Sequence, residues 1–123
     1  MGLGGCAQQQ AMSCAAPLRP AVEVALYFGR NIAGGGEVSD AEWASFLATE
    51  VTPRFPEGLS VIDMAGQWRG PSGEIARERS KMLAVIVFDP PAHGLKVQAI
   101  IDAYLKRFHQ QAVLRTERPV CAG

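Results

Sequence analysis

The chain has 123 residues, with 12 basic and 12 acidic side chains and 48% hydrophobic residues. This length corresponds to one domain, large enough to bury a core without the help of a metal ion. Because the charges balance, no net field draws the protein to nucleic acid, and no apolar run approaches the roughly 20 residues that span a bilayer.

The first 20 residues are small, polar and interrupted by prolines, which predicts a flexible N-terminal tail before a single domain at residues 21 to 121. Residues 3 to 6 (LGGC) resemble a bacterial lipobox, which makes Cys6 a candidate lipidation site and the only expected membrane attachment. Only two residues precede this segment, so the charged and apolar regions of a signal peptide are absent. Either the native start lies upstream and the protein is periplasmic or secreted, or the match is accidental and the protein is cytoplasmic.

The cysteines and histidines do not form a metal signature. Cys6, Cys14 and Cys121 lack the spacing of zinc ligands, and His93 and His109 lie far from all three in the sequence. We therefore expect no metal and no cofactor.

Residues 21 to 28 (AVEVALYF) alternate in a way that predicts a first strand, with Tyr27 on the face opposite Leu26 and Phe28. A run of glycines at residues 34 to 36 then leads into apolar residues at helical spacing, and Pro53 ends this helix near Thr52.

Glycines before a helix can form a phosphate site, but here Glu37, Asp40 and Glu42 would repel a phosphate. The same stretch predicts a capped helix start. Ser39 is the expected N-cap and Glu42 closes a capping box, while Val38 and Trp43 are placed to form a hydrophobic staple.

Two extended runs follow, at residues 58 to 69 and 74 to 89, and the residues between them (GPSG) predict a long hairpin. With an even loop centred on Pro71 and Ser72, residues of opposite parity pair across the hairpin. Trp68 then shares a face with Arg77, Arg79 and Lys81, whereas Asp63 lies on the other face.

An apolar stripe from Val97 to Phe108 predicts a second helix, and residues 112 to 118 predict a last strand that ends before Pro119. His93 falls in the loop before this helix and His109 at its end, where a cation would suit the helix dipole. The order β-α-β-β-α-β predicts a ferredoxin-like α+β fold with both helices on one face of a four-stranded antiparallel sheet.

In this fold the start of the first strand approaches the end of the last, close to Cys14 and Cys121. If the protein is exported, we expect a disulfide between these two cysteines. Two free thiols are the alternative in a reducing compartment.

Six blocks along the chain together resemble one known family: YFGR (27 to 30), GGGEVSDAEW (34 to 43), VTPRFPEGL (51 to 59), GQWR (66 to 69), RERSK (77 to 81) and PVC (119 to 121). The family is the bacterial domain-of-unknown-function family number 3574, whose members are small secreted or lipoprotein-like proteins. The resemblance implies export and implies no particular reaction.

The expected ligand site is the sheet face without helices, because it would combine aromatic and cationic side chains: Tyr27, Trp68, Arg77, Arg79 and Lys81. Such a face suits a small anionic or aromatic ligand, or a protein partner, without catalysis. The alternative is a small cofactor-independent enzyme similar to α/β-barrel monooxygenases or isomerases, although no catalytic triad stands out.

Residues 82 to 88 are apolar on both faces, and helices cover only one face of such a sheet. This pattern predicts a homodimer in which two sheets pack face to face. Burial of this strand by the N-terminal tail is the alternative.

Overall fold

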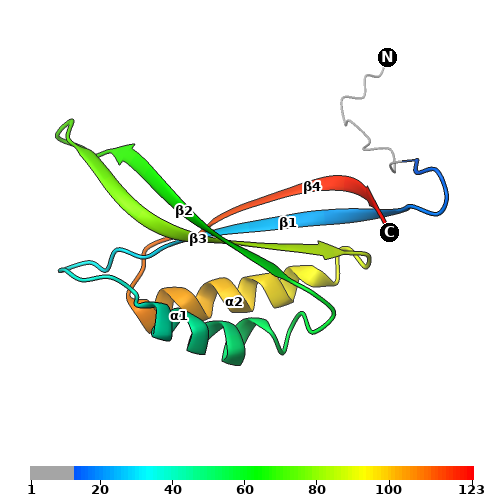
Figure 1. The fold of residues 1–123 in the computed structure, drawn as a ribbon, viewed down its shortest axis with the longest axis horizontal. Coiled ribbons are helices and arrows are strands. Elements are labelled where there is room, and N and C mark those ends of the chain that lie inside the picture. The colour runs from blue at the N-terminus through cyan, green and yellow to red at the C-terminus, as the bar shows by residue number, and fades with distance from the viewer. Residues whose placement is uncertain (1–12) are drawn as a thin grey trace, which may run out of the picture.

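The computed structural model describes residues 13 to 123 and has the ferredoxin-like α+β fold (Figure 1). Four strands form one antiparallel sheet in the order β2-β3-β1-β4. The elements are β1 (Arg19–Gly29), α1 (Asp40–Phe46), η1 (Leu47–Val51), β2 (Ser60–Arg69), β3 (Ile75–Val87), α2 (His93–Phe108) and β4 (Leu114–Ala122).

Both helices lie on one face of the sheet, while the far end of the β2-β3 hairpin extends beyond them (Figure 1). The core between the layers is aromatic at its centre. Phe28 of β1 packs against Trp43 and Tyr104, with ring centroids 5.2 and 4.7 Å away. The apolar stripe of α2 is buried as its spacing predicts, because Val97, Ile100, Tyr104 and Phe108 all face the sheet side of the helix.

The first helix begins as its sequence predicts. Ser39 accepts a hydrogen bond from the Glu42 backbone N–H, and the Glu42 carboxylate accepts one from the Ser39 N–H, both at 3.0 Å. Val38 and Trp43 are buried beside this capping box. α1 continues without a break into the π-helical turn η1, whose C-cap is Thr52.

The last strand does not end before Pro119, as expected, but runs through it to Ala122. Pro119 lies opposite Val22, and the hydrogen-bonded pairs of this ladder are the odd-numbered β1 residues, such as Glu23 with Arg118. The missing N–H of Pro119 would therefore point away from β1, which is why an edge strand tolerates it.

The register of the β2-β3 hairpin also differs from the expected one. Gly70 N–H donates to the Glu74 carbonyl at 2.7 Å, so the loop holds three residues, with Gly73 at φ +92°. With an odd number of loop residues, even-numbered residues pair with even-numbered ones and odd with odd. Trp68 therefore lies opposite Ala76, and the odd-numbered Arg77, Arg79 and Lys81 are on the other face. The expected sharing of one face by Trp68 and the three cations is therefore wrong.

Cys14 and Cys121 are joined by a disulfide, with Cα atoms 5.6 Å apart, at the end of the sheet where β1 starts and β4 finishes. The expected flexible tail and the candidate lipidation site Cys6 lie largely or wholly outside the described residues. β1 begins at Arg19, two residues before the expected domain start.

Candidate functional site

The loop after β1 is an ordered turn clamped to the sheet. Ile32 N–H donates to the Gly36 carbonyl and Gly35 N–H to the Ile32 carbonyl, both at 3.0 Å. Asn31 and Glu37 form an isolated antiparallel β-bridge. Gly34 to Gly36 all have positive φ, between +89° and +123°, which explains why glycines occupy the turn. The turn carries Glu37 and Asp40 to the helix-side face of the hairpin.

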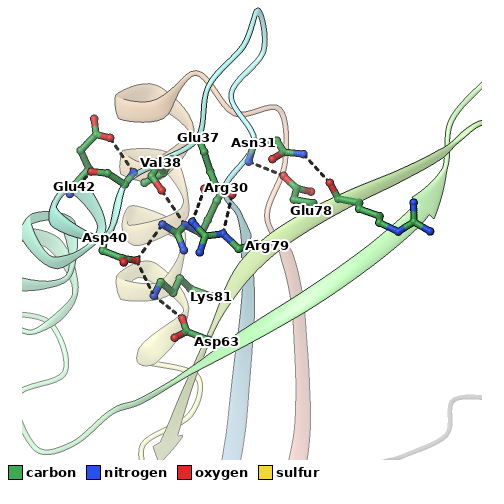
Figure 2. A network of polar contacts seen from close by, with 12 residues as sticks. Arg30, Asn31, Glu37, Val38, Asp40, Glu42, Asp63, Glu78, Arg79 and Lys81 are labelled. Carbon is green, nitrogen blue, oxygen red and sulfur yellow. Dashed lines mark hydrogen bonds and ion pairs between the residues drawn. The ribbon is translucent and has the colours of Figure 1, made fainter.

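Two cations are buried under this turn. Arg30 is only 3% exposed; its Nε donates to the Val38 carbonyl at 2.8 Å, and its guanidinium forms an ion pair with Asp40 at 3.1 Å. Lys81 has a side chain that is 10% exposed, and its Nζ lies 2.5 Å from Asp63 and 3.6 Å from Asp40 (Figure 2). Buried cations need such partners, so this network is first of all a structural clamp between the glycine turn and the sheet.

A third ion pair lies nearer the surface. Arg79 Nε and Nη2 bond the two oxygens of Glu37 at 3.1 and 2.5 Å (Figure 2). This bidentate contact lowers the pKa of Glu37 below its ordinary value and raises that of Arg79. The hydrogen bond from Lys81 likewise holds the pKa of Asp63 below its ordinary value.

Beside this pair lies an open polar pocket of about 370 Å³. Gln67 of β2 and Arg77 of β3 are directly opposite each other, so their side chains share the helix-side face of the hairpin. Asn31 borders the same pocket, donating its side-chain amide to the Arg77 carbonyl at 3.3 Å. Among residues 13 to 123 the Arg77 guanidinium forms no ion pair.

The structure divides the five residues expected to form one ligand site. Arg77, Arg79 and Lys81 lie on the helix-side face together with Asp63, which was expected on the other face. Tyr27 lies opposite Met82 on the face without helices. Trp68, which is 55% exposed, lies on that same face, because even-numbered residues of β2 and β3 pair with each other. Tyr27 and Trp68 therefore do not share a face with the three cationic side chains.

A separate hydrogen-bonded pair, between the buried His93 and the partly exposed Glu117, was not expected from the sequence. His93 is the first residue of α2, not part of a loop, and its Nε2 lies 3.1 Å from Glu117 of β4. Burial opposes ionisation of Glu117, but the hydrogen bonds from His93 and Arg115 outweigh it and lower the pKa of this carboxyl. No spacing in the sequence predicts a contact between the start of a helix and the last strand.

Residues 13 to 123 contain no group of three or more histidine, cysteine or acidic side chains arranged for a metal ion. No helix in this part of the chain has the length and apolar character needed to cross a membrane.

Comparison with known proteins identifies a family and a fold. The sequence profile of a family described as "Protein of unknown function (DUF3574)" matches residues 23 to 123. No curated protein matches the sequence.

Among solved structures, a phage SAM lyase in complex with S-methyl-5'-thioadenosine superposes with a TM-score of 0.62 at 16% identity, covering 83% of this chain and 90% of its own. The apo form of a phage SAM lyase gives 0.61 at 14% identity, covering 93% and 92%. CutA from Synechococcus elongatus gives 0.48 at 15% identity, covering 86% and 82%. At these identities the likeness to the phage enzyme concerns the fold alone.

Proposed function

The chain belongs to the DUF3574 family, and we propose that it is an exported, non-catalytic binding domain for a small carboxylate or phosphate, held in the polar pocket of the β2-β3 hairpin. One observation carries this proposal. Gln67 and Arg77, the latter without an ion pair among the described residues, lie on opposite strands and line one pocket whose volume suits a small molecule.

Two acidic and two basic residues line the pocket, and among the described residues Arg77 is the one whose charged group has no partner. Glu37 is already engaged by Arg79, and the Glu78 carboxylate accepts the Asn31 backbone N–H at 2.9 Å. The guanidinium of Arg77 is thus the one that would gain a counter-ion on binding. A planar guanidinium beside an amide donor matches the two oxygens of a carboxylate or phosphate.

The disulfide supports the export part of the proposal. Disulfides persist in oxidising compartments, and Cys14 and Cys121 are bonded here. A protein purified from its native host with both thiols free would contradict export. Attachment through a lipid on Cys6 is a further expectation, which mass spectrometry of the native protein would test.

Binding can be tested by thermal shift and calorimetry with acetate, benzoate, inorganic phosphate and S-methyl-5'-thioadenosine. The last is included because it is the ligand named for the phage SAM lyase. We expect at least one anion to raise the melting temperature of the wild type and of Trp68→Ala, which alters the other face, but not that of Arg77→Gln. Equal shifts in all three proteins would refute the pocket as the site.

The face without helices supports a second binding role. Ile62, Trp68 and Ile86 are 48%, 55% and 41% exposed there, and Glu23 and Arg118 form an ion pair on the same face. A face-to-face homodimer would bury these side chains. Light scattering should give twice the monomer mass for the wild type and a reduced mass for Ile62→Asp; a monomeric wild type would exclude the dimer.

The enzyme alternative would have to rest on the buried His93 and its hydrogen-bond partner Glu117. Neither residue lines the polar pocket or the larger groove described below, which supports binding rather than catalysis. Turnover of S-methyl-5'-thioadenosine or an aromatic substrate by the wild type, with loss in His93→Gln, would reverse this preference.

A further inference from the structure

The other end of the β2-β3 ladder holds a larger groove, of about 660 Å³, at the free edge of a strand. β2 begins at Ser60, opposite Ala84, while β3 continues to Val87. The last residues of β3 therefore have β1 on one side and no strand on the other. The groove lies along this open side, far from the polar pocket of the hairpin.

The direction of the backbone groups at this edge follows from the two ladders. Arg30 N–H donates to the Arg79 carbonyl at 3.1 Å, so odd-numbered β3 residues bond β1. The Gly70-Glu74 bond shows that even-numbered residues bond β2. Ile86 therefore directs its N–H and C=O into the groove, because it would form the next hydrogen-bonded pair after Ser60–Ala84 if β2 were longer.

The chain on the far side of the groove does not supply this pair. Gly58 would lie opposite Ile86 if the ladder continued, but its N–H donates to the Phe55 carbonyl at 3.3 Å. In the described part of the chain no hydrogen bond joins Ile86 to residues 57 to 59. The groove thus has room for one more strand beside β3, and the Ile86 N–H and C=O on its wall are free to bond such a strand.

The groove walls carry side chains as well as backbone groups. Ile86 and Phe88 are 41% and 40% exposed, and Glu57, Asp89 and Lys96 stand at its border without ion pairs among the described residues. Among the charged residues that line the groove, two are carboxylates and one is an ammonium, while the Arg19 guanidinium lies 4.1 Å from the centre of the Phe88 ring. A strand with apolar side chains and a basic end complements both features.

We propose that this groove is a docking site for an extended polypeptide segment of a partner protein, which adds a strand beside residues 84 to 88 and carries a lysine or arginine at its end. Main-chain hydrogen bonds to Ile86 provide the attachment, and the apolar walls and acidic border select the sequence. The site is independent of the anion pocket.

Amide exchange measured by NMR tests the geometry. In the free protein, the Ile86 amide should exchange at least about 100-fold faster than those of Val85 and Val87, which are bonded to β1. A capped hexapeptide, Lys-Val-Thr-Val-Thr-Lys, should slow the exchange at Ile86. An Ile86 amide as protected as its neighbours before the peptide is added would overturn the proposal.

Binding of the same peptide can then be blocked by a side chain placed in the groove. A Cβ at Gly58 meets no atom within 4 Å, so Gly58→Leu should fold normally and weaken peptide binding at least tenfold. Ala44→Leu, which adds the same side chain on exposed helix surface, should bind like the wild type. A peptide with glutamates in place of both lysines should bind about tenfold more weakly at low salt.

Two results would contradict the proposal. One is equal peptide affinity of the wild type and Gly58→Leu. The other is association of the protein with itself that Gly58→Leu abolishes, because the occupant would then be a second copy of the chain. Failure of anion binding at Arg77 would leave these results unchanged, since the two sites share no residue.

Discussion

Asp40, an exposed carboxylate at the start of α1, forms an ion pair with the buried Arg30 guanidinium, with 3.1 Å between the nitrogen and the oxygen. The same oxygen lies 3.6 Å from Lys81 Nζ, so one surface residue is the counter-ion of two buried cations. The arrangement ties the glycine turn, the first helix and β3 together. The glycine turn first suggested a phosphate site, but the carboxylates that follow it, Glu37 and Asp40, pair with the protein's own cations.

Replacing Arg30 tests this clamp. Arg30→Met leaves the Val38 carbonyl without its side-chain donor and removes the main partner of Asp40, so we expect the free energy of unfolding to fall by about 1.5 to 3 kcal/mol. Denaturant titration measures the change. Arg77→Met, at an exposed position outside the clamp, is the control and should change stability little; equal losses in both variants would mean that burial of Arg30 is unimportant.

Acid should weaken the ion pairs at Glu37 and Asp63. Their pKa values are lowered in the folded protein from ordinary values of 4.5 and 3.8, because of Arg79 and Lys81 respectively. The unfolded chain therefore binds protons first, and the stabilisation present at neutral pH is lost as the pH falls from about 5 to about 3. The variant with both Glu37→Gln and Asp63→Asn should be less stable at pH 7 and lose less over this range; a parallel decline in both proteins would contradict the assignment.

Tyr104 should contribute a buried hydrogen bond as well as its ring. Its hydroxyl donates to the Gly29 carbonyl at 2.6 Å, and burial raises the pKa of the phenol, so it keeps its proton at ordinary pH. Tyr104→Phe should cost about 1 to 2 kcal/mol of unfolding free energy, since the ring is retained and the carbonyl loses its partner. Thermal unfolding monitored by circular dichroism would detect this change, and no loss would show that water replaces the hydroxyl.

The disulfide should stabilise the closed end of the sheet. It links positions 107 residues apart, for which restriction of the unfolded chain predicts up to about 4 to 5 kcal/mol. The variant with both Cys14→Ser and Cys121→Ser should unfold at lower denaturant concentration, and reductant should shift the wild type, but not the variant, to the same midpoint. If reductant left the unfolding midpoint of the wild type unchanged, the disulfide would not contribute to the stability of the fold.

His109 offers a stabilising change. It caps the C-terminus of α2 with φ +53°, in the left-handed region that costs a side-chain-bearing residue energy. His109→Gly should raise the free energy of unfolding by about 0.5 to 1 kcal/mol. Gln110→Gly, one residue beyond the cap, should not stabilise the protein.

Local patterns in the sequence predicted the elements well. The alternation of Val24, Leu26 and Phe28, the capping box of Ser39 and Glu42, and the α2 stripe each depend on neighbours within a few residues, and all three are present in the structure. The order of these elements also predicted the ferredoxin-like topology, because few arrangements cover one sheet face with two helices.

The candidate site was less predictable, because one turn determined which residues share a face. Since side chains alternate along a strand, adding a single residue to the hairpin loop moved Trp68 away from Arg77, Arg79 and Lys81 and brought Asp63 to Lys81. Pairs such as Arg30 with Asp40, or His93 with Glu117, join separate elements and have no characteristic spacing.

The sequence by itself determined the elements, their order and the start of the first helix, because these follow from short-range periodicity and capping. Only the tertiary structure decided the hairpin register, the ion-pair clamp under the glycine turn and the unpaired edge at Ile86. Those features depend on how strands align and where one strand stops, and contacts distant in the chain set both.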